Sequence, residues 1–148
     1  MVTMVLTQDI LHTIRDLFYD HWAAADPTQA TIGTTHFFAG PRESIIRAPA
    51  IGFRTDRENY RERSGGSKPF VLVYHYLFID VYALDDDELH KMKEEIMHIL
   101  EDERMTPGGG IHHLEYAGDW RPMSHLTHSR ENVSSRLRIV AVYWRIPS

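Results

Sequence analysis

The sequence predicts an α+β fold, in which two helices pack on a mainly antiparallel sheet of about four to five strands. Two stretches repeat apolar residues at three- and four-residue spacing, which is typical of amphipathic helices. Other stretches, the longest at 70–84, alternate as strands do and are bounded by proline and glycine. The chain has 148 residues, so we expect one domain over 1–148.

The composition excludes several kinds of site. The chain has no cysteine, so it has no disulfide, no thiolate metal site and no cysteine nucleophile. Its formal net charge of −5 disfavours a nucleic-acid binder, which must neutralise phosphates. We expect no secretory signal and no membrane span, because the first residues lack a basic start and no apolar run is long enough.

The first predicted helix covers "TQDILHTIRDLFYDHWAAAD", residues 7–26. Its apolar residues recur on one helical face: Leu11, Ile14, Phe18 and Trp22. Thr7 is the expected N-cap. We expect the helix to end at Asp26-Pro27, because a residue before proline avoids helical geometry.

Five stretches are predicted to be extended. The first two, about 34–39 and 43–54, are expected to be joined by a turn at Gly40-Pro41. The third, "FVLVYHYLFIDVYAL", is apolar or aromatic on both faces, which is typical of a central strand, and we expect His75 to be a hydrogen-bonded core residue. "IHHLEYAGDW" and "RLRIVAVYWRIP" are the last two strands, separated by a long polar connection.

Four consecutive acids, Asp85 to Glu88, precede the second predicted helix. Clustered carboxylates can bind hard cations, but the alternating ligands, central glycine and distal glutamate of a calcium loop are absent. Carboxylates at a helix start cap free amide groups and complement the helix dipole. We therefore interpret Asp85 or Asp86 as the N-cap, and "MTPGGG" as the stop of this helix.

Four late histidines, His112, His113, His125 and His128, are candidate metal ligands. His112 and His113 are adjacent, so in a strand we expect them to point to opposite faces, where they cannot easily share a metal. We therefore predict no metal site. Ser124, His125 and Asp119 lack a nucleophile elbow, and the glycines at 108–110 lack the lysine of a phosphate loop. We predict no catalytic residue, no cofactor and no enzymatic activity.

The polar stretch "RENYRERSGGSK" is predicted to be a flexible arm at about 54–69, with a glycine-rich tip. Aromatic and arginine residues, which are enriched in interface cores, occur here and in the extended segments. These aromatic and arginine residues therefore indicate that the chain has an interaction surface.

The element order resembles that of the tail-completion and tail-terminator proteins of tailed bacteriophages and related archaeal viruses. The similarity is carried by the order of elements over nearly the whole chain, above all by "FVLVYHYLFIDVYALDDDELHKMKEEIMHILE" and by the late segments "HHLEYAGDWRP" and "SRLRIVAVYWRI". The polar segment 122–135 is longer than in the simplest members.

This resemblance implies a structural virion protein at the head–tail neck, assembled in the host cytoplasm. It implies a ring, expected to be a hexamer, that caps the tail tube and joins it to the capsid connector. The partners would be further copies of the chain and the adjacent connector and tail-tube proteins, with DNA only passing through the lumen and no membrane. The candidate subunit-contact residues of the arm are Arg54, Arg57, Tyr60, Arg61, Arg63 and Lys68.

Two other classes of function stay open from the sequence. One is a small histidine-dependent metalloenzyme that uses the late histidines. The other is a ligand-binding α+β regulatory domain, in which a sheet face holds a small molecule.

Overall fold

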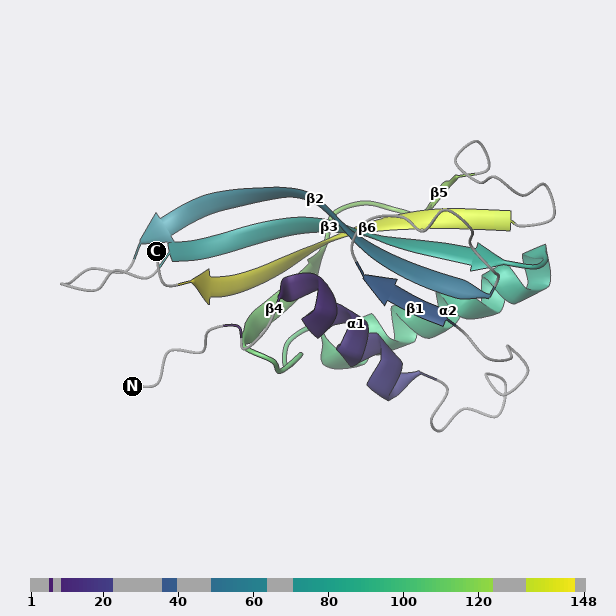
Figure 1. Cartoon of the computed structure of the whole chain (residues 1–148), viewed down its shortest axis with the longest axis horizontal. Coiled ribbons are helices and arrows are strands. Elements are labelled where there is room, and N and C mark those ends of the chain that lie inside the picture. Colours follow the sequence, from purple (N-terminus) through teal and green to yellow (C-terminus); the bar gives the residue numbers. More distant parts are fainter. Residues whose placement is uncertain are drawn as a thin grey trace.

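The computed structural model describes residue 6 and residues 9–22, 36–39, 49–63, 71–123 and 133–145. The helices are α1 (Ile10–His21) and α2 (Asp86–Glu103). The strands are β1 (His36–Ala39), β2 (Ala50–Arg63), β3 (Val71–Ala83), β4 (Ile111–Tyr116), β5 (Arg121–Pro122) and β6 (Val133–Arg145) (Figure 1). The α+β fold is confirmed; the sheet has one strand more than expected because of the two-residue β5.

The strands form one twisted sheet in the order β1-β2-β3-β6-β4, with β5 also pairing with β6. All pairs are antiparallel except β1 with β2. β3 lies between β2 and β6 and pairs with β6 over its whole length, from Val71↔Arg145 to Ala83↔Val133. The prediction of a central strand at 70–84 is thus confirmed.

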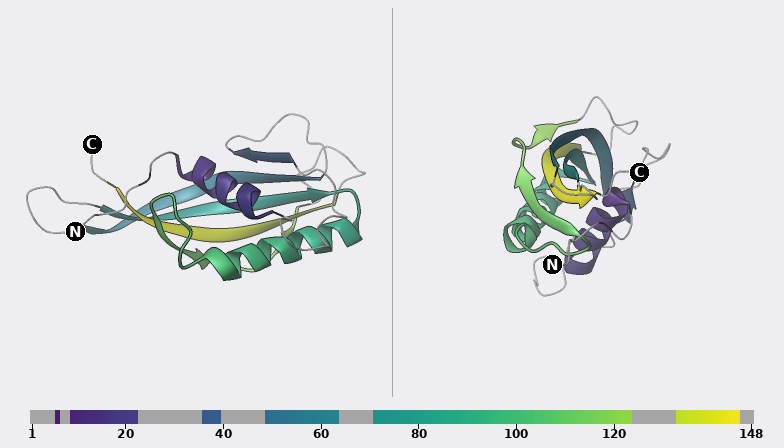
Figure 2. Two further views of the ribbon diagram at one scale, coloured as in Figure 1. Left: turned by 90° about the horizontal axis from the view of Figure 1, so that it is seen from below. Right: turned by 90° about the vertical axis from the view of Figure 1, so that its left-hand side faces the viewer.

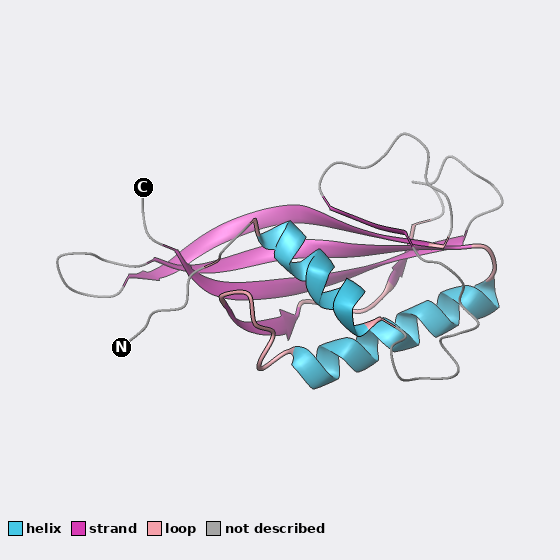
Figure 3. Ribbon diagram, turned by 60° about the horizontal axis from the view of Figure 1, so that its bottom comes forward, coloured by secondary structure: helices cyan, strands magenta, loops and turns pink. Residues whose placement is uncertain are grey.

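Both helices cover the same face of the sheet, and the core lies between them and that face (Figure 3). α1 contributes Ile14 and Phe18, and the ring of Phe18 packs on that of Phe53 with centroids 5.4 Å apart. α2 contributes Met92 and Ile96, both fully buried. The sheet contributes the inward residues of its three long strands: Ile51, Phe53, Val71, Val73, Leu77, Ile79, Val81, Leu137, Ile139 and Ala141.

Helix α1 is shorter than predicted. Asp9, not Thr7, is its N-cap, and the Asp9 carboxylate accepts a hydrogen bond from the backbone amide of Leu11 at 3.2 Å. The helix ends at His21, because Trp22 adopts an extended conformation and packs edge-on against Phe37. Residues 7 and 23–35, including Asp26-Pro27, lie outside the described part of the chain.

Strand β1 runs parallel to β2, with His36 opposite Ala50. Parallel neighbours need a crossover connection rather than a hairpin, and the turn predicted at Gly40-Pro41 lies outside the described residues. Residues 40–48 are outside the described ranges.

Strand β2 is also longer than predicted. The stretch from Arg54 to Arg63, which we expected to be flexible, continues the strand and pairs with β3 as far as Arg63↔Val71. The polar sequence is accommodated by two register shifts, between Thr55 and Arg57 and between Tyr60 and Glu62. Residues 64–70, which include the rest of the predicted arm, lie outside the described ranges.

The start of α2 confirms the capping interpretation. The Asp85 carboxylate accepts a hydrogen bond from the Glu88 amide at 2.8 Å, while the Glu88 carboxylate accepts one from the Leu84 amide at 2.9 Å. After the helix, Gly108, Gly109 and Gly110 have φ of 77°, 63° and 89°, which favour glycine. They turn the chain into β4.

Candidate subunit interface

The face of the sheet that points away from the helices is here named the outer face. It carries residues of the three long strands: Arg54, Asp56 and Arg57 of β2, Leu72, Tyr74, Tyr76, Phe78, Asp80 and Tyr82 of β3, and Arg136, Arg138, Val140, Val142 and Trp144 of β6. The strict alternation of β3 and β6 places these residues opposite the core residues. Neither helix covers this face (Figure 2).

Arginines lie over the aromatic rings in the middle of the outer face. The Arg136 guanidinium carbon lies 4.3 Å from the centre of the Phe78 ring. Arg57 and Arg138 lie over the Tyr76 ring at 4.7 and 4.6 Å. Each of these cation–π contacts crosses between neighbouring strands, so the outer face holds its arginines in fixed positions.

Two arginines of the outer face are also paired with carboxylates. Arg136 donates two hydrogen bonds to Asp80, at 2.7 and 3.0 Å, and Asp80 is 6% exposed. The hydrogen bond to Asp80 is the main reason that the pKa of Arg136 is raised. Arg138 pairs with Asp56 at 2.7 Å. The bidentate geometry of the Arg136–Asp80 pair is the strong form of an arginine–carboxylate contact.

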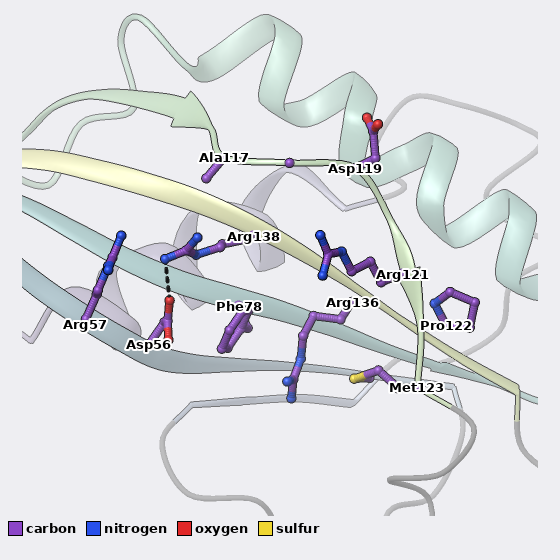
Figure 4. Close-up of a pocket in the computed structure, with 11 residues that line it drawn as sticks. Asp56, Arg57, Phe78, Ala117, Asp119, Arg121, Pro122, Met123, Arg136 and Arg138 are labelled. Carbon is purple, nitrogen blue, oxygen red and sulfur yellow. Dashed lines mark ion pairs between the residues drawn. The ribbon is translucent and has the colours of Figure 1, made fainter.

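A cavity of about 500 Å³ opens on this part of the outer face, and Figure 4 shows its lining. The lining residues are Asp56, Arg57, Phe78, Ala117, Gly118, Asp119, Arg121, Pro122, Met123, Arg136 and Arg138. Phe78 lies between the arginines, and Asp119 points away from them (Figure 4). We name this cavity the arginine pocket.

The arginine pocket carries unbalanced positive charge. Its four arginines are accompanied by two lining carboxylates, Asp56 and Asp119, and by Asp80, which pairs with Arg136. Within the described part of the chain, neither Arg57 nor Arg121 has a carboxylate partner, although Arg57 contacts Tyr76. Arginine stays protonated throughout the physiological pH range, so such a pocket is suited to binding carboxylates or phosphates rather than to transferring protons.

Apolar clusters flank the arginines on both sides. Leu72, Val140 and Val142 pack with Tyr74, Tyr76, Ala117 and Trp144 on one side, and Phe38, Ala50, Tyr82 and Met123 form the cluster on the other. Aromatic and arginine side chains at the centre of a patch are typical of protein interfaces. The outer face therefore has the composition of a subunit contact.

The outer face includes two of the six predicted contact residues, Arg54 and Arg57. Tyr60 and Arg63 pair with β3, and Arg61 lies at the register shift between Tyr60 and Glu62. The side chains of these three residues are not described, and Lys68 lies outside the described ranges. Sequence reasoning missed Arg121, Arg136 and Arg138. The signal for the last two was available, because they occupy the outward positions of the alternating final strand.

His75 is a buried, hydrogen-bonded histidine, as expected. Its Nε2 lies 2.9 Å from the Thr55 hydroxyl, and its Nδ1 lies 3.1 Å from the Tyr143 hydroxyl and 3.2 Å from the Glu58 carboxylate. Burial lowers the pKa of His75, and this effect outweighs the attraction of Glu58. The neutral ring is therefore part of the packed core.

The adjacent histidines His112 and His113 do not lie on opposite faces of β4. A register shift between Ile111 and His113 brings the two adjacent imidazoles together, with their Nδ1 atoms 2.6 Å apart. Our expectation that they point to opposite faces was wrong, because it assumed a regular strand. The described residues hold no group of three or more histidine and acidic side chains placed to bind a metal, and His125 and His128 lie outside them.

Comparison with known proteins gives a match at the level of structure only. No protein-family model matches the chain, and no curated protein matches it. Among solved structures, a chain of the "Virion of native gene transfer agent (GTA) particle" matches with a TM-score of 0.51 and 9% sequence identity. The match covers 93% of this chain and 100% of that one. The two chains share a fold.

No described helix is long and apolar enough to cross a lipid bilayer.

Proposed function

We propose that this protein is a structural subunit of a virion or virion-like particle. The observation that carries the proposal is the fold shared with a chain of a gene transfer agent virion, over the full length of that chain. The outer face supports it independently, because arginine and aromatic side chains there are partly exposed on a sheet face that the described helices leave uncovered.

Within the particle, we propose the role of a tail terminator or tail-completion protein at the head–tail neck. The chain would form a closed ring, most simply a hexamer, that caps the tail tube and contacts the capsid connector. Such rings arise from a heterologous contact, in which two different surfaces of one subunit meet on neighbouring copies. The negative net charge of −5 suits a lumen through which DNA passes without adhering.

No catalytic step is part of this proposal. The arginine pocket supplies binding groups, and His75 is occupied by core hydrogen bonds. The account therefore needs no cofactor. We propose that the protein is located in the finished particle and is assembled into it in the host cytoplasm.

Deleting the gene from a host that produces the particles tests the role. A terminator or completion protein predicts heads without joined tails, or tails of uncontrolled length, in electron micrographs. Supplying the intact chain from a plasmid should restore joined particles of uniform tail length. Normal particles in the deletion strain would contradict the proposed role.

A further inference from the structure

We propose that the corner formed by Leu84 to Asp87 of one subunit inserts into the arginine pocket of a neighbouring copy of the chain. The inference rests on the proposed function in that it assumes assembly of identical subunits. It further names the two surfaces that form the contact and the charged groups that stabilise it. Both surfaces are visible on the described part of one chain.

The corner from Leu84 to Asp87 carries carboxylates that accept no hydrogen bond from the N-terminal amides of α2. Asp85 and Glu88 are engaged in the reciprocal hydrogen bonds at the start of α2. Asp86 and Asp87 are exposed, and among the described residues Asp86 has no cationic partner, while Asp87 meets only Lys91 at 3.1 Å. The corner thus presents two carboxylates to solvent.

The corner also presents an apolar side chain. Leu84 is 56% exposed, which makes it one of the few large exposed hydrophobic residues in the described ranges. The lining of the arginine pocket complements these groups. It includes the apolar side chains of Phe78 and Met123 and the guanidinium groups of Arg57 and Arg121. One leucine and two carboxylates would satisfy both kinds of group.

A subunit cannot make this contact with itself. Phe78, which lines the pocket, lies six residues before Leu84 on β3, so the corner lies about 20 Å further along the strand, beyond Met123 at the near end of the pocket. From there α2 returns across the opposite face of the sheet (Figure 2). The corner therefore leads away from its own pocket, which leaves a second copy as the occupant.

The charges of the two surfaces are complementary over a wider area. α2 carries eight carboxylates and two lysines along Asp86–Glu103. The arginine pocket has four arginines against three carboxylates, Asp56, Asp119 and the Arg136 partner Asp80, in a chain whose net charge is −5. Opposite potentials of this kind steer association and fix the register of a contact.

The test is a charge exchange in the full-length chain. The pocket variant is Arg57→Glu with Arg121→Glu, and the corner variant is Asp86→Lys with Asp87→Lys. Each variant alone is expected to weaken self-association by about tenfold or more in sedimentation equilibrium. An equimolar mixture should recover assembly, because the reversed corner of one variant meets the reversed pocket of the other.

Control variants separate this contact from a general effect of charge. Glu94→Lys with Asp102→Lys makes the same charge change on exposed positions of α2 away from the corner and should weaken self-association much less than the corner variant does. Circular dichroism and thermal unfolding of every variant check that it is folded. Assembly of the wild type should also weaken as salt is raised.

The outcomes distinguish the inference from the function on which it rests. If the wild type assembles and the reversed variants assemble equally well, the corner–pocket contact is wrong and the proposed ring stands. Failure of the mixture to recover assembly, with both variants folded, also overturns the contact. If the wild type is monomeric under all conditions, the proposed ring fails first.

Discussion

At the scale of single residues, the ion pair between Asp80 and Arg136 is the most constrained polar contact of the outer face. Asp80 is 6% exposed and accepts both hydrogen bonds of the Arg136 guanidinium, whose other side lies on the Phe78 ring. Removing one partner of a buried pair leaves the other charge uncompensated. The pair therefore fixes the register of β3 and β6 at the floor of the arginine pocket.

The substitution Asp80→Asn is expected to lower the free energy of unfolding by about 3 kcal/mol, because Arg136 keeps its charge and loses its counterion. Urea denaturation of both proteins measures the difference. The matched control is Asp87→Asn, which removes the exposed partner of Lys91 and should change stability by less than about 0.5 kcal/mol. Equal effects of the two substitutions would show that the Asp80 pair contributes no more than a surface pair.

His75 makes stability depend on pH. Burial lowers its pKa in the folded state, so the unfolded chain binds a proton first as pH falls. The stability gained from the neutral ring is therefore full above the unfolded pKa of about 6.5 and is lost as pH falls below it. Glu58, Tyr143, Asp9 and Arg145 act on the same ring, and all remain in the variant below.

We expect the free energy of unfolding of the wild type to fall more steeply between about pH 7 and pH 5 than that of His75→Gln. Glutamine keeps hydrogen-bonding capacity toward Thr55 and Tyr143 but does not titrate. Chemical denaturation at a series of pH values measures both slopes. Parallel pH profiles would mean that His75 titrates equally in the folded and unfolded chain.

At the scale of elements, the stretch from β3 into α2 is the part that the sequence predicts best. Alternation of apolar side chains on both faces identifies the central strand, and Asp85 marks the helix start because a carboxylate there has a backbone amide to accept from. These signals are local, and nothing distant in the chain overrides them.

The N-cap of α2 can be tested directly. Asp85→Ala should lower the free energy of unfolding by about 1 kcal/mol, because the Glu88 amide loses its acceptor. Asp86→Ala, one position later, removes an acid that accepts no capping hydrogen bond and should have a smaller effect. Thermal unfolding of both variants makes the comparison. An equal loss in both would assign the effect to the helix dipole rather than to the cap.

The elements that sequence reasoning misjudged depend on distant partners. The polar stretch after Arg54 has weak strand propensity, yet it is held by pairing with β3 and by the contact of Arg57 with Tyr76. Removing residues 57–67 would therefore delete the end of β2 and is expected to destabilise the fold. The parallel direction of β1 and the register shift at His113 likewise leave no local trace.

The candidate site was predictable only in part, for the same reason. Arg54 and Arg57 attracted notice because they stand in an arginine-rich stretch. The arginine pocket as a unit could not be found, because Arg121 reaches it from β5, and Arg136 and Arg138 from β6, more than sixty residues after Arg57. The pairing of β3 with β2 and β6, and of β5 with β6, brings them together.

At the scale of the whole molecule, the chain is two-sided. The helices cover one face of the sheet (Figure 3), while the other face carries arginine and aromatic side chains around a separate apolar cluster. α2 carries most of the excess negative charge and lies on the side opposite the arginine pocket. A subunit with unlike surfaces on its two sides is suited to a head-to-tail contact that closes into a ring.

The mass of the purified, full-length chain in solution tests this account most directly. Sedimentation velocity over a wide range of protein concentration should show a discrete closed species, most simply six copies of the 17.2 kDa chain, with ring-shaped particles in electron micrographs of the same fraction. A folded chain that sediments at 17.2 kDa at every concentration would contradict the account.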